Sequence, residues 1–254
     1  MSRRRSFFES SNPVMKEEAY QKAASGTLDG DMIQAEGEKM TASGAVNKTF
    51  ILTGIMILTA IVGFSNPNQL FLWGGAIGGL VIVLIASARP QNSPILAPIY
   101  AALEGLFVGA ISAMYANLFN GIIFQAVTLT IAVLFIMLFL YKSDIIKVTK
   151  QLRTGVIMAT GAVFVLYLVN IVLSLFGINM PFLHEGGLIG IGISLLIVGI
   201  AAFNLLLDFD NFDKGEQYGA PGYMEWFSAM GLLITLVWLY VEILRLLAMI
   251  SSSD

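Results

Sequence analysis

Cysteine is absent from the 254-residue sequence, and histidine occurs only once, as His184. The lack of cysteine excludes disulfide bonds, thiolate metal ligands and a cysteine nucleophile. A zinc hydrolase needs several histidines, and a serine protease within a membrane needs a histidine beside its serine. His184 instead lies in a short stretch between two apolar segments. We therefore expect that the protein is not an enzyme and has no cofactor, and the sequence leaves metal binding undecided.

Charged residues are also scarce. They make up 12% of the chain, against about 25% in soluble domains, while 57% of the residues are hydrophobic and the mean hydropathy is +0.80. This composition leaves too little polar surface to cover a body that faces water, so we expect the lipid bilayer as the surroundings. The net charge of −3 provides no electrostatic attraction for nucleic acid, and nucleic acid is not an expected partner.

Long apolar segments dominate the chain after residue 45. A helix needs roughly 20 apolar residues to cross a bilayer core of about 30 Å. Segments of this length are too long for the strands of a membrane barrel, and a helix satisfies its own backbone hydrogen bonds within lipid. The sequence thus predicts an all-α membrane protein, a seven-transmembrane-helix bundle at residues 46–250 that follows a polar N-terminal tail at residues 1–45. The predicted helices cover residues 46–64, 70–88, 94–116, 121–141, 154–177, 187–207 and 223–250.

The positions of lysine and arginine predict the orientation. Seven lie in the tail up to Lys48, and six lie in the connections after the second, fourth and sixth segments. The connections after the first, third and fifth segments have none. Positive residues accumulate in cytosolic connections, so we expect a cytosolic N-terminus. An unbroken seventh helix would place the C-terminus outside, whereas a break or re-entrant turn would return it to the cytosol.

Ionisable side chains within membrane segments are energetically costly and are functional candidates by default. Burial favours the neutral form of a carboxyl group, so such a group can respond to pH. The sequence leaves open whether Glu104, in the third segment, is a pH switch or a permanently protonated glutamate that donates one hydrogen bond. Its partner could be Arg245, Asn170 or a backbone carbonyl. The candidate proton-sensing or ion-path residues are Glu104, Asp208, Asp210, Glu242 and Arg245.

Three further patterns favour structural interpretations. Glu242 and Arg245 are three residues apart, a spacing that places both side chains on one helix face as an ion pair. The acidic stretch after residue 207 does not match an EF-hand loop, since it lacks ligands at the required spacing. We expect it to be a solvated helix cap, with a weak divalent-cation site as the alternative. The pairs Gly74 with Gly78, Gly75 with Gly79 and Gly105 with Gly109 allow close helix approach, and we expect packing rather than dimerisation.

Several stretches share their order and spacing with a known family. They include Leu-Leu-Asp-Phe-Asp-Asn-Phe-Asp-Lys-Gly from Leu206, Gly-Ala-Pro-Gly-Tyr-Met-Glu-Trp from Gly219, and Val-Trp-Leu-Tyr-Val-Glu-Ile-Leu-Arg-Leu-Leu from Val237. Ser-Asn-Pro-Val from Ser11 and Ala-Leu-Glu-Gly-Leu-Phe-Val-Gly-Ala from Ala102 complete the set. Together they resemble the bacterial branch of the Bax inhibitor 1 family. The resemblance implies a seven-helix fold whose last helix is central, in a bacterial cytoplasmic membrane.

The resemblance also implies a function, namely a proton-sensitive calcium leak. In that family two aspartates on the last two helices share a proton and hold the pore closed. Asp208 matches the first of them, whereas Thr235 stands at the position of the second. Glu242 or Glu104 are the candidates for replacing it, although neither matches it in position.

The sequence therefore favours a multi-pass membrane protein that acts as a pH-sensitive leak channel for Ca²⁺ or another cation. Glu104 and Asp208 are the expected titrating groups, and Arg245 is the expected counter-charge. The alternative is a regulator without transport that binds a membrane quality-control protease or another membrane partner, a role that the polar tail suits and that some bacterial relatives have.

Overall fold

The computed structural model describes residues 38–177 and 187–252. In this part of the chain seven long helices are each long and apolar enough to cross a bilayer, and the only β-type pairing is an isolated bridge between Lys39 and Pro221. The predicted fold class is thus confirmed. The helices are α2 (Ala42–Ser65), α3 (Gln69–Ala88), α4 (Ser93–Ala116), α5 (Ile122–Lys142), α6 (Lys150–Leu175), α8 (Leu188–Gln217) and α9 (Tyr223–Ser251), with a short 3-10 turn, η1 (Pro90–Asn92), before α4.

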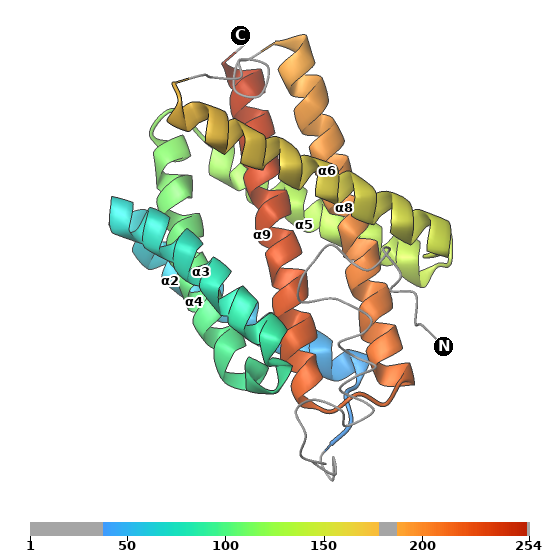
Figure 1. The fold of residues 1–254 in the computed structure, drawn as a ribbon. Coiled ribbons are helices and arrows are strands. Elements are labelled where there is room, and N and C mark those ends of the chain that lie inside the picture. The colour runs from blue at the N-terminus through green and yellow to red at the C-terminus, as the bar shows by residue number, and fades with distance from the viewer. Residues whose placement is uncertain (1–37, 178–186, 253–254) are drawn as a thin grey trace.

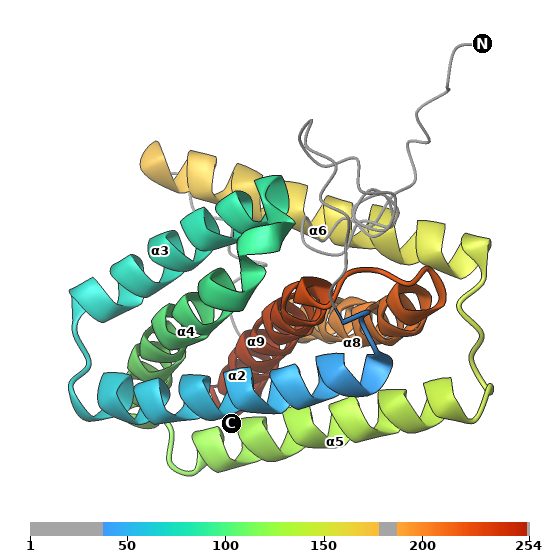
Figure 2. The same ribbon diagram turned by 90° about the horizontal axis from the view of Figure 1, so that it is seen from below.

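Helix α9 occupies the centre of the bundle. It packs against α2, α4, α5 and α8, and the two views show these helices arranged around it (Figures 1 and 2). Its buried side chains lie on every side of the helix, from Met224 to Met249. The other helices bury one face and expose large apolar side chains, such as Phe50 and Phe135, where lipid would lie. The last helix is therefore central in the bundle, as the resemblance implies.

The helix ends follow local capping chemistry. Thr41, Asn68 and Thr149 each precede a helix and accept a hydrogen bond from a backbone N–H in its first turn, which satisfies a donor that has no partner within the helix. Gly219 adopts a positive φ of 62° in the connection between α8 and α9. Glycine tolerates that conformation without the steric cost of a side chain, so α9 can turn back beside α8.

The predicted end of the sixth helix is wrong. Helix α8 continues ten residues beyond position 207 to Gln217, and the acidic stretch is helical rather than a solvated cap. Its burial supplies the reason, because Asp208, Asn211, Phe212 and Gly215 face the interior of the bundle. Helix α6 likewise begins before the predicted residue 154, at Lys150, so Arg153 belongs to its first turn.

The two chain ends require smaller corrections. Helix α2 begins at Ala42, and Met40 is already buried, so the bundle starts before the predicted boundary at residue 46. Helix α9 runs without a break to Ser251, which rejects the re-entrant alternative. The tail up to residue 37 and His184 lie outside the described residues.

Glycines bring α2 and α4 into close contact. A Cβ atom at Gly109 of α4 would overlap the carbonyl oxygen of Ala60 on α2, and one at Gly105 would overlap the Met56 carbonyl. On α3, a Cβ at Gly75 would lie 2.7 Å from the carbonyl oxygen of Leu103. These three glycines therefore serve packing within the chain, as expected, whereas Gly74 has only Leu70 of its own helix within 4 Å of a Cβ position.

Replacing Gly109 with alanine should destabilise the protein by about 2 kcal/mol, since the new methyl group meets backbone rather than a flexible side chain. Gly54→Ala on α2 is the matched control, because nothing lies within 4 Å of a Cβ atom there. Thermal unfolding in detergent micelles measures both variants. An equal effect of the two substitutions would contradict the close α2–α4 contact.

Candidate functional site

A line of polar side chains runs along the buried face of α8. Asn204, Asp208 and Asn211 are spaced by four and three residues, which places them on one helix face, and all three are buried. We call these three residues the polar seam. Apart from them, the buried face of α8 is mainly apolar, with Leu205 and Leu206 fully enclosed. The seam is therefore a polar strip within an apolar bundle, where ionisable groups are costly.

Asp208 is the one ionisable residue of the seam, and only 2% of its surface is exposed. The Thr235 side chain on α9 and the Arg153 guanidinium both act on its carboxyl group, and the Thr235 hydroxyl donates to the Gly231 carbonyl of its own helix at 3.4 Å. The second carboxyl oxygen, Oδ2, is buried without a hydrogen-bond partner among the described residues. Thr235, where the resemblance implies the second aspartate, therefore lies near Asp208.

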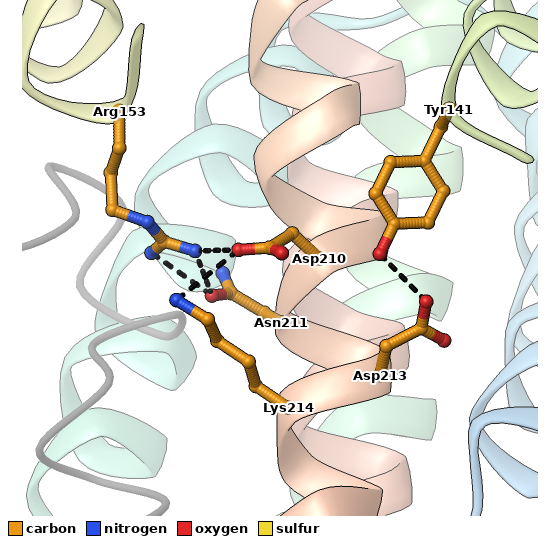
Figure 3. A network of polar contacts seen from close by, with 6 residues as sticks. All are labelled: Tyr141, Arg153, Asp210, Asn211, Asp213 and Lys214. Carbon is orange, nitrogen blue, oxygen red and sulfur yellow. Dashed lines mark hydrogen bonds and ion pairs between the residues drawn. The ribbon is translucent and has the colours of Figure 1, made fainter. Parts of the chain in front are cut away.

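Asp210 lies at the edge of the seam in a cluster of charges (Figure 3). The Arg153 guanidinium donates to the Asp210 carboxylate and, at 3.2 Å, to the side-chain oxygen of Asn211. The Lys214 ammonium lies 3.3 Å from the same Asp210 carboxylate. Asp210 is therefore neutralised by two cations.

A second contact joins α5 to the same end of α8. The Tyr141 hydroxyl donates to Asp213 at 2.6 Å, and Lys142 lies 3.7 Å from the other oxygen of that carboxylate. Figure 3 shows both aspartates projecting from α8 toward different neighbouring helices. The end of α8, which the sequence predicted to be a solvated cap, thus contacts both α5 and α6 through side-chain interactions.

The predicted pair on α9 is confirmed. Arg245 Nη2 lies 2.8 Å from Glu242 Oε2, and the Tyr167 hydroxyl of α6 donates to the other carboxylate oxygen of Glu242. The Arg245 guanidinium also lies 5.3 Å from the centre of the Tyr167 ring. Arg245 is therefore the partner of Glu242, whereas the cation that acts on Asp208 is Arg153.

Glu104 lies apart from these groups, in the interface between α3 and α4. A Cβ atom at Gly79 of α3 would lie 2.5 Å from Glu104 Oε2, and 3.5 Å from the ring of Tyr100. No hydrogen bond or ion pair joins Glu104 to another described residue, so none of the three expected partners is found. Because Gly79 has no side chain, the Glu104 carboxyl group can occupy the space beside it.

No group of three or more histidine, cysteine or acidic side chains in the described part of the chain could hold a metal ion together. The alternative interpretation of the acidic stretch, a weak divalent-cation site, therefore has no such group of ligands among the described residues. Asp210 and Asp213 point to separate cationic or hydroxyl partners there.

Seven apolar helices with buried charges define a multi-pass membrane protein. The sequence matches the model of the Bax inhibitor 1 like family over residues 10–252, nearly its whole length, and the chain belongs to that family. Comparisons with curated proteins and with solved structures gave no match.

Sequence reasoning did not select Arg153, Tyr167, Tyr141 or Asp213 as site residues. Arg153 counted only as a positive charge in a connection, because the apolar segment was taken to begin after it. Its position seven residues before Thr160 and fourteen before Tyr167 is the sequence pattern that could have revealed it, since this spacing places all three on one helix face.

Proposed function

We propose that the protein is a pH-sensitive leak channel for Ca²⁺ or another cation in a bacterial cytoplasmic membrane, with its N-terminus in the cytosol. Asp208 supports this proposal most directly. It is a carboxyl group enclosed between α8 and α9, with one oxygen buried and without a hydrogen-bond partner among the described residues. Acidic side chains that line a path select for cations.

The neighbours of Asp208 suit such a path. Oxygen atoms of Thr235, Asn204 and Asn211 are the kind of group that replaces part of a cation's hydration shell. Arg153 and Lys214 pair with Asp210 beside the seam, so the Asp210 carboxylate partly offsets two positive charges that would otherwise repel an entering cation. Protonation of Asp208 would remove the negative charge that attracts the cation, and this makes the leak sensitive to pH.

Flux into proteoliposomes tests the proposal. Vesicles that contain the protein should take up Ca²⁺ faster than protein-free vesicles, and the rate should change across about pH 5 to 8, where a buried carboxyl group can titrate. A parallel measurement with K⁺ determines the selectivity. Uptake equal to that of protein-free vesicles at every pH would contradict a leak and favour the alternative function.

That alternative is a regulator that binds a membrane quality-control protease or another membrane partner. The chain that directly follows the tail, residues 38–41, contacts the connection between α8 and α9. The Met40 N–H donates to the Ala220 carbonyl at 2.7 Å, and the Gly222 N–H donates to the Glu38 carbonyl at 2.7 Å. The hydroxyl and backbone N–H of Thr41 both donate to Glu225 at 3.0 Å. Residues 38–41 therefore lie beside the connection between α8 and α9.

Deleting residues 2–36 separates the two functions, because it removes the tail and keeps these contacts. A leak should keep its rate after the deletion, whereas regulation through the tail should be lost. Deletion through Met40 would be a poorer test, since Met40 is part of the core.

A further inference from the structure

Helix α6 has a polar side chain at every seventh position along one face. Arg153, Thr160 and Tyr167 follow each other at intervals of seven residues. An α-helix turns through nearly two full turns in that interval, so the three side chains form one stripe with a slight drift.

Each member of the stripe contacts a polar group of the bundle interior. Arg153 binds Asp210 and Asn211 of α8. The side-chain amide of Asn204 on α8 donates to the Thr160 hydroxyl at 2.8 Å, and Tyr167 donates to Glu242 of α9. Figure 1 shows why the partners change along the stripe, since α6 runs obliquely over α8 and then over α9. We call these the three α6 contacts.

The apolar packing of α6 is thin by comparison. Within the described residues its close helix packing is with α8, where Val156 and Ile157 form a small cluster with Leu207. Gly155 and Gly161 have nothing within 4 Å of the position of a Cβ atom, so they do not bring α6 close to a neighbour. Most of its large side chains, such as Phe164 and Leu175, are exposed.

This distribution matters because lipid chains are as apolar as the side chains of α6. Apolar surface therefore gains little by leaving lipid for a helix interface, and interhelical hydrogen bonds together with close packing decide whether a membrane helix stays in contact. For α6 the close packing is limited, so the polar contacts carry a large share of its association with the bundle.

We propose that α6 is a movable helix that the three α6 contacts hold over the polar seam. The contacts reach two of the three seam residues, Asn204 and Asn211, and the third, Asp208, lies between them on the same face of α8. Outward movement of α6 would uncover the seam from that side. The proposal goes beyond the leak, because it concerns an equilibrium between two positions of a helix and stands whether or not the protein conducts ions.

Distance measurements between spin labels test it, and the cysteine-free chain allows labels at engineered cysteines alone. One label replaces Phe164 on α6 and the other replaces Met114 on α4, both of which are exposed. The test variant combines Thr160→Val and Tyr167→Phe. It removes the hydroxyl groups of two of the three α6 contacts, keeps the side-chain volumes nearly unchanged and retains the Arg153 contact. Ser174→Ala is the control, since among the described residues the Ser174 hydroxyl bonds only to the Ile171 carbonyl of its own helix.

In lipid nanodiscs the label pair should give one narrow distance in the otherwise unmodified protein and in Ser174→Ala. The double variant should add a second population at a longer distance. A label pair at Leu58 on α2 and Phe135 on α5, both exposed, should give the same distances in all variants. Identical distances from the α6 pair in every variant would overturn the proposal, and so would equal broadening of both pairs. Thr160→Val alone provides a milder variant with the same expected direction.

Discussion

Replacing Arg153 with methionine is expected to lower the free energy of unfolding by about 3 kcal/mol, which is the low end of the cost of breaking a buried ion pair. The guanidinium and the Asp210 carboxylate are both mostly enclosed, with side-chain exposures of 10% and 17%. Methionine keeps much of the side-chain length but leaves Asp210 with Lys214 as its only cation. It also removes the donor to Asn211. Thermal unfolding of the purified protein in detergent measures the effect.

Two further variants make this result specific. Lys150→Met removes a positive charge from an exposed position on the same helix and should change the free energy of unfolding by less than about 1 kcal/mol. The double variant Arg153→Met with Asp210→Leu should recover part of the lost stability, because it removes the carboxylate that Arg153→Met leaves with one partner. Equal losses for Arg153→Met and Lys150→Met would show that the cluster at the end of α8 is not stabilising.

Replacing Asp208 with asparagine should slow Ca²⁺ uptake at neutral pH at least about tenfold, which corresponds to ~1.4 kcal/mol. Asparagine has the size of aspartate, so the packing between α8 and α9 should be retained. It lacks the negative charge that we propose attracts the cation within the apolar bundle.

Asp144→Asn is the matched control for this variant. It makes the same chemical change at an exposed residue in the connection between α5 and α6, and asparagine tolerates the positive φ of 54° found there. The control should take up Ca²⁺ at the rate of the unmodified protein. A tenfold loss in both variants would attribute the effect to a change in net charge rather than to the seam.

The fold was predictable because each membrane helix must form all of its backbone hydrogen bonds within itself when it is surrounded by lipid. Length and apolar composition are therefore enough to locate each helix. That argument fails where a helix leaves the apolar region. The end of α8 carries Asp208, Asp210 and Asp213, and composition there is typical of a solvated loop. The helix continues because Arg153 and Tyr141 on neighbouring helices donate hydrogen bonds to Asp210 and Asp213, and a single sequence does not contain that information directly.

The candidate site was predictable only where both partners lie on one helix. The i, i+3 spacing fixes the contact between Glu242 and Arg245 within one helix, so the sequence predicted it correctly. The partners of Glu104 and Asp208 depend on how neighbouring helices are rotated. Glu104 faces Gly79 on α3, whereas Asp208 faces Thr235 on α9, and the sequence alone gave no means to separate the two acids.

The pH profile of Ca²⁺ uptake by the unmodified protein and by Asp208→Asn, reconstituted side by side, tests the account most directly. We expect the uptake of the unmodified protein to vary across about pH 5 to 8, and we expect the variant to show a low rate that does not vary with pH. A variant that reproduces the unmodified rate and profile at every pH would contradict the role that we give to Asp208.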